Sequence, residues 1–154
     1  FYNNYSSDYV MNTLYGTPHS NLNTQQHKAA YTVNKNEEDM LNNVINWNDC
    51  VRQSNNKPDL AQELLDMLAL ELPQFKNDIS QSHAQRNAKD LRDHVHKLHG
   101  ACCYCGANTL KKILFDIENQ MDYWTDAELA HHVDDLLTAI DQVQNVLATK
   151  QYKN

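Results

Sequence analysis

Four long segments in which apolar residues recur at alternating steps of three and four constrain this chain more than any other feature. Residues spaced in this way fall on one side of a helix. The apolar stripes span residues 61–79, 91–105, 110–121 and 129–147. Four amphipathic helices joined by short polar turns pack as an antiparallel four-helix bundle, so the sequence predicts an all-α fold with the stripes as its core. Pro73 should bend the first of these helices without ending it, because the apolar spacing resumes beyond it.

Local signals indicate where some of the helices begin. A short extra helix is predicted over about residues 46–54, because Asn46 can cap it and Asp49 would lie in its first turn, where the helix dipole favours an acid. Thr125 and Glu128 have the spacing of a capping box, which predicts that the last helix opens there.

Composition agrees with a helical domain and divides the chain. Only 3 glycines occur in 154 residues, too few for the many tight turns of sandwiches and barrels. Residues 1–44 are rich in Asn, Ser, Thr, Gln and Tyr and lack an apolar repeat, so we expect a polar, flexible linker or tail. The bundle is expected over residues 45–150, with 151–154 as the C-terminal end.

Charge and cysteine usage exclude several classes of function. The net charge of −7 argues against a nucleic-acid partner, since such proteins present a basic surface to phosphates. No apolar run approaches the roughly 20 residues that cross a bilayer, so no direct membrane contact is expected in this fragment. The 4 cysteines do not form the spaced framework of a secreted domain, which favours the cytoplasm.

We expect a monomer, and the first residue, Phe1, suggests a piece of a longer protein.

The segment around His96 contains residues that packing does not explain. At about 100° per residue, His96, Gly100 and Cys103 lie nearly opposite the buried stripe, with Arg92 and His99 on the shoulder between. His96 is therefore predicted to face solvent. Gly100 lies in the middle of the helix, where glycine costs about 1 kcal/mol relative to alanine. It either clears space above His96 or allows tight helix packing. A second glycine, at residue 106, falls where the helix could stop.

An exposed imidazole with cleared space above it can accept a phosphoryl group. The ring titrates near neutral pH, so an unprotonated nitrogen is available as a nucleophile at cellular pH. Phosphoryl transfer requires positioning and charge neutralisation more than covalent assistance. Arg92, Lys97 and His99 lie within one turn of His96 and could hold the group.

The run His96-Lys97-Leu98-His99-Gly100, followed by Gly106-Ala107, resembles the signature of histidine phosphotransfer (HPt) domains, His-x-Leu-Lys-Gly with a further glycine. It is most similar to the C-terminal HPt domains of BarA/GacS-type hybrid sensor kinases. The resemblance implies that His96 is the phosphoacceptor and that Gly100 is the clearance position. His99 stands where the family usually has lysine, which could make transfer sensitive to pH.

The family further implies a shuttle between two receiver domains. The phosphoryl group would arrive from a receiver aspartate of a hybrid kinase and leave for the receiver of a response regulator, with Mg²⁺ bound by the receivers and no cofactor bound by this chain. The expected docking surface consists of Lys89, Arg92, Gly100 and Cys103, with Lys97 and His99 nearby. Its positively charged side chains contrast with the acidic remainder of the domain and would complement the acidic pocket of a receiver.

Two other functions remain open at this stage. His96, His99 and Cys103 could meet on one helical face as three zinc ligands with an open position. Alternatively, the chain could be an interaction bundle without chemistry, whose function would survive replacement of His96. A kinase is not expected, because there is no glycine-rich loop to bind ATP.

Overall fold

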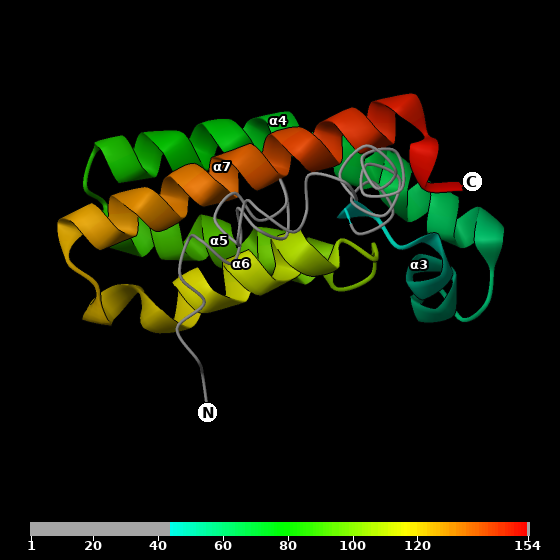
Figure 1. Cartoon of the computed structure of the whole chain (residues 1–154), viewed down its shortest axis with the longest axis horizontal. Coiled ribbons are helices and arrows are strands. Elements are labelled where there is room, and N and C mark those ends of the chain that lie inside the picture. The colour runs from blue at the N-terminus through cyan, green and yellow to red at the C-terminus, as the bar shows by residue number, and fades with distance from the viewer. Residues whose placement is uncertain (1–43, 154) are drawn as a thin grey trace, which may run out of the picture.

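The computed structural model describes residues 44–153, which fold as a bundle of four long helices with short helical elements at its ends (Figure 1). The elements, in order, are α3 (Trp47–Gln53), α4 (Pro58–Ala84), α5 (Ala88–Cys102), α6 (Asn108–Gln120), η1 (Met121–Tyr123), α7 (Asp126–Thr149) and η2 (Gln151–Lys153). Each long helix packs against the next along the chain, and α7 returns to α4. No strand occurs in this part of the chain, so the predicted all-α bundle is confirmed.

The predicted helix starts carry the expected caps. Asn46 Oδ1 accepts a hydrogen bond from the backbone N–H of Asp49 at 3.0 Å, which begins α3. At α7, the Glu128 N–H donates to Thr125 Oγ1 at 3.2 Å, and the Thr125 N–H donates to the Glu128 carboxylate at 2.8 Å. Such caps contribute about 1 kcal/mol each to stability. Pro73 lies within α4 and does not end it.

The predicted stripes form most of the core, which also includes Ile45, Cys50, Ala107, Ala139 and Val146. Of the residues whose spacing defines the stripes, only Phe75 and Leu129 are not fully buried, and both pack against the core from its edge. The buried ones are Ala61, Leu65, Leu68, Leu72, Ile79, Leu91, Val95, Leu98, Cys102, Cys105, Leu110, Ile113, Leu114, Ile117, Met121, Val133, Leu136, Ile140, Val143 and Leu147. The periodicity missed Tyr152, which is 3% exposed. Its ring centroid lies 5.9 Å from that of Trp47, and its hydroxyl accepts from Gln62 Nε2 at 3.1 Å. The C-terminal element therefore packs on both α3 and α4.

The segment after α5 differs from the prediction. Helix α5 ends at Cys102 rather than at residue 105, and a tight turn leads to α6. Gly106 does not stop the helix. Its φ is 63°, and its carbonyl accepts a hydrogen bond of 2.9 Å from the N–H of Asn46, which joins this turn to the start of α3. Cys105 is still buried, because the backbone keeps turning after the helix has ended, with the Cys105 N–H donating to the Cys102 carbonyl at 3.3 Å.

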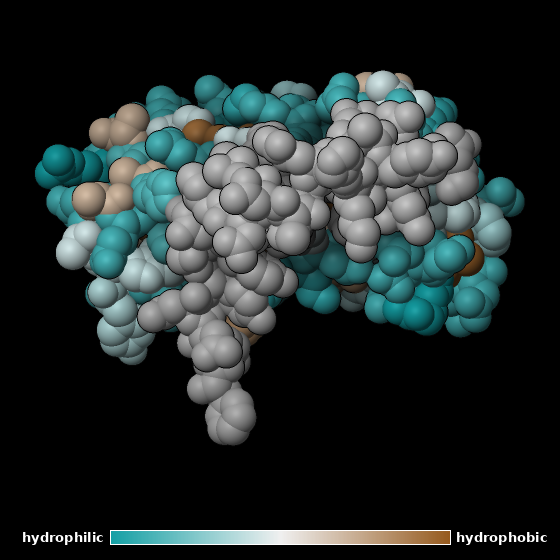
Figure 2. Space-filling view, in the orientation of Figure 1, coloured by the Kyte–Doolittle hydropathy of each residue, from teal (hydrophilic) through white to brown (hydrophobic). Residues whose placement is uncertain are grey.

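The visible surface of the described residues is largely hydrophilic, with apolar residues scattered over it (Figure 2). Among residues 44–153, no helix combines the length and the apolarity that crossing a membrane requires. The predicted polar tail lies outside the described residues, apart from Val44 at its end.

Candidate functional site

Helix α5 presents the His96 side chain to solvent. This side chain is 71% exposed, whereas Leu91, Val95 and Leu98 on the opposite side of the helix are at most 1% exposed. The exposure predicted from the helical spacing is therefore confirmed. The apolar stripe fixes which side of α5 faces the core, and that orientation places the His96 imidazole in solvent.

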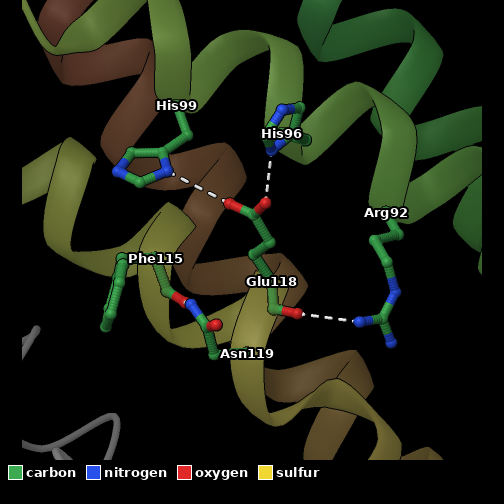
Figure 3. A network of polar contacts seen from close by, with 6 residues as sticks. All are labelled: Arg92, His96, His99, Phe115, Glu118 and Asn119. Carbon is green, nitrogen blue, oxygen red and sulfur yellow. Dashed lines mark hydrogen bonds and ion pairs between the residues drawn. The ribbon is translucent and has the colours of Figure 1, made fainter.

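The His96 ring is held from the neighbouring helix by Glu118 of α6, as Figure 3 shows. One carboxylate oxygen of Glu118 contacts His96 Nδ1, and the other contacts His99 Nδ1 at 3.1 Å. The side chains of Glu118 and His99 are only 21% and 18% exposed, so both are restrained by their surroundings. Sequence reasoning missed Glu118, because it lies 22 residues from His96 and only the register between α5 and α6 brings it there.

The charge of Glu118 determines which nitrogen of each ring carries a proton. Partial burial raises the pKa of the Glu118 carboxyl, but hydrogen bonds from His96 and His99 and the positive charge of their protonated forms together lower it below its ordinary value. Glu118 is therefore ionised at neutral pH, and a carboxylate can only accept hydrogen bonds. Both rings must donate from Nδ1–H. A neutral His96 then has its lone pair on Nε2, on the opposite edge of the ring.

Arg92 fixes the same end of α6 against α5. Its Nη1 donates to the backbone carbonyl of Glu118 at 3.0 Å, and its Nη2 donates to Asp122 Oδ1 at 2.5 Å. The ring of His99 in turn lies edge-on to Phe115 of α6, with 5.9 Å between centroids. Arg92 and His99, predicted to hold a phosphoryl group, thus both also contact α6.

The remaining residues of the predicted surface surround His96 on α5. An ideal Cβ built on Gly100 meets no atom of the described residues within 4 Å, so none of the helices in residues 44–153 packs against this glycine and they leave the space above His96 open. Lys97 is exposed and Cys103 is partly exposed. Lys89 is also exposed, and its Nζ lies 3.2 Å from Asp93 Oδ2. An exposed pair of this kind costs little to break when a partner binds.

The other cysteines are core residues rather than reactive groups. Burial raises the pKa of the Cys50 thiol to about 11 and that of Cys105 to about 12, and it also raises the pKa of Cys102. These thiols stay protonated at neutral pH and are therefore poor metal ligands and poor nucleophiles. Residues 44–153 contain no cluster of three or more side chains placed to hold a metal ion. The zinc alternative has no support in this part of the chain.

Comparisons with known proteins agree on one family. The family model of the Hpt domain matches residues 63–148. The signal transduction histidine-protein kinase BarA of Shigella flexneri is 35% identical over 105 residues, which is 68% of this chain and 11% of that kinase. Its counterpart in Escherichia coli K12 is 34% identical over the same shares. The crystal structure of the HPT domain from a Shewanella sensor hybrid histidine kinase superposes with a TM-score of 0.66 and 30% identity, covering 74% of this chain and 97% of that one.

Proposed function

This chain belongs to the Hpt domain family, and on that basis we propose that His96 is the residue on which it carries a phosphoryl group in a two-component phosphorelay. The observation that carries the proposal is the oriented imidazole. His96 is exposed, its Nδ1 is bound to Glu118, and the Gly100 backbone leaves space beside it. Its Nε2 is consequently the nitrogen that a partner can reach.

The transfer exchanges one bond to phosphorus for another. The Nε2 lone pair attacks the phosphorus of an aspartyl phosphate, the N–P bond forms, and the P–O bond to the aspartate breaks, with the electron pair leaving on the carboxylate. Onward transfer reverses these steps, with the aspartate of a second receiver as the nucleophile. Mg²⁺ bound by each receiver would neutralise charge on the phosphoryl oxygens.

The surface around His96 suits an acidic partner. Lys89 and Lys97 place positive charge on the exposed face of α5, although the whole chain has a net charge of −7. A receiver presents carboxylates where it binds Mg²⁺ and phosphate, so the charges are complementary. Gly100 and Cys103 offer small side chains on which a partner's loops can lie close to His96. Arg92 and His99 form the border of this surface toward α6.

The relatives suggest where such a domain acts. The chain spans about a tenth of the length of the BarA kinases that it matches. We infer that it works in the cytoplasm with the receivers of a hybrid sensor kinase and of a response regulator. It would act as a monomer that obtains phosphate only from a phosphorylated receiver and not from ATP.

Replacement of His96 tests the proposal directly. The full chain is mixed with a phosphorylated receiver and Mg²⁺, and protein-bound phosphate that is labile in acid and stable in base is measured. We expect His96→Gln to abolish this label while helicity by circular dichroism stays unchanged. His131→Gln removes an exposed histidine from α7 and serves as the matched control, which should label normally. Undiminished labelling of His96→Gln would refute the proposal and direct attention to His99 and His94.

A further inference from the structure

We propose that the Glu118 carboxylate keeps the Nδ1 proton on the phosphorylated His96 ring and thereby makes phosphohistidine a strong phosphoryl donor. This inference rests on the proposed function and assigns a positioning residue to it. It concerns the second half of the relay, in which the domain gives its phosphoryl group away.

The geometry allows Glu118 to act on the phosphorylated ring as well as on the free one. Nδ1 and Nε2 lie on opposite edges of the imidazole, so a phosphoryl group on Nε2 does not displace the carboxylate from Nδ1. The carboxylate is held in place from its other oxygen by His99 at 3.1 Å. Its backbone is held by Arg92 through the Glu118 carbonyl at 3.0 Å. The acceptor for the Nδ1 proton is therefore already in position before transfer begins.

The proton on Nδ1 determines what leaves when the N–P bond breaks. With the proton in place, the phosphorylated ring carries a positive charge, and cleavage returns the electron pair to Nε2 of a neutral imidazole. Without the proton, cleavage would leave an imidazolate anion, a much more basic and therefore poorer leaving group. A negative charge next to Nδ1–H favours the protonated form of the ring. Glu118 thus lowers the barrier to onward transfer.

The charged groups around this carboxylate support its ionised state. His96, His99 and Arg92 of α5 face Glu118, and Asp122 of η1 lies beyond the Arg92 guanidinium, with which it pairs. A glutamine at this position would still offer an oxygen to His96 Nδ1 but would remove the charge. Hydrogen bonds to charged groups are roughly twice as strong as neutral ones. Because the His96 side chain is 71% exposed, solvent will weaken the effect.

The Glu118→Gln variant removes the charge of the side chain but keeps an oxygen that can contact His96 Nδ1. The phosphorylated full chain is prepared, and the ³¹P resonance of its phosphohistidine is followed against pH together with the rate of transfer to an unphosphorylated receiver in Mg²⁺. We expect Glu118→Gln to accept phosphate on His96 and to donate it about threefold to tenfold more slowly at neutral pH. The ³¹P titration midpoint should fall by about half a pH unit to one unit, since one unit corresponds to a tenfold change.

Two further variants complete the test. Glu63→Gln makes the same chemical change at an exposed position of α4 and should leave both rate and midpoint unchanged. Glu118→Asp keeps the charge one methylene farther away and should lie between the wild type and Glu118→Gln. A wild-type rate and midpoint in Glu118→Gln would overturn the inference, as would equal defects in Glu118→Asp and Glu118→Gln. Neither result touches the assignment of His96, which the loss of label in His96→Gln tests separately.

Discussion

Alanine substitutions at the two glycines of the bundle should change stability in opposite directions. An ideal Cβ on Gly106 would lie 2.3 Å from the carbonyl oxygen of Asn46 and 3.2 Å from the backbone nitrogen of Cys50. Both contacts are with backbone, which cannot rotate away as a flexible side chain can. The φ of Gly106 is 63°, a conformation that alanine adopts only under strain. Gly106→Ala must therefore move the turn, the start of α3, or both.

The expected loss is the sum of three effects. Placing alanine in the left-handed region costs about 1–2 kcal/mol. Moving the turn away from Asn46 weakens the hydrogen bond from its N–H to the Gly106 carbonyl, which is worth about 1 kcal/mol. Crowding a packed region costs a further 1–3 kcal/mol or so. The free energy of unfolding should fall by about 3–6 kcal/mol, a large part of the roughly 5–15 kcal/mol typical of a domain.

Gly100→Ala provides the matched control. Gly100 lies inside α5, and within the described part of the chain its Cβ would meet nothing within 4 Å, so alanine brings no clash there and a better helix propensity. Its free energy of unfolding should rise by up to about 1 kcal/mol. Urea titrations followed by circular dichroism measure both variants. A loss below about 1 kcal/mol in Gly106→Ala, or a clear loss in Gly100→Ala, would refute this account of the two glycines.

Three further predictions test the surface, the core thiols and the pH response. Gly100→Gln should slow phosphoryl transfer between this chain and a receiver without unfolding the bundle, and an unchanged rate would mean that Gly100 clears no docking space. Iodoacetamide should alkylate Cys103 rapidly and the three buried cysteines only on the time scale of unfolding, as peptide mass analysis after timed quenching would reveal. Burial, and then the charge of His131, lower the pKa of His132, which stacks on Trp124 with 3.8 Å between ring centroids. His132 therefore binds a proton more readily in the unfolded chain than in the folded one. The free energy of unfolding, measured by urea titration, should decline as the pH falls below about 6.5, and His132→Phe should make this decline shallower.

The helices and their faces could be predicted because the responsible signals are local. The spacing that buries Leu91, Val95 and Leu98 also places His96 in solvent, and neighbouring turns of one helix suffice to show it. The caps at Asn46 and Thr125 depend on residues three positions away. Intervals of this length are fixed by helix geometry and do not require a tertiary structure.

The parts that could not be predicted depend on how separate segments meet. By its spacing, Glu118 falls outside the apolar stripe of α6, and no motif in the neighbouring sequence marks it as a functional residue. Tyr152 follows the last stripe and is buried only because Trp47 and Gln62 lie opposite it. The left-handed Gly106 is needed because the backbone of Asn46 approaches it, and that approach joins segments 60 residues apart. Each of these features requires the register between elements, which helical periodicity does not contain.

That register connects the buried turn to the exposed site. Arg92, His96 and His99 are spaced by four and three residues, so they form one row along α5 that faces Glu118 on α6. The turn that ends in Gly106 determines where α6 begins relative to the end of α5. It therefore determines which residue of α6 lies opposite this row. A shift of α6 by one residue would rotate the Glu118 side chain by about 100° away from His96. The proton on His96 Nδ1, and with it the choice of Nε2 as the proposed nucleophile, thus depends on backbone packing at Gly106, which is not one of the residues of the proposed docking surface.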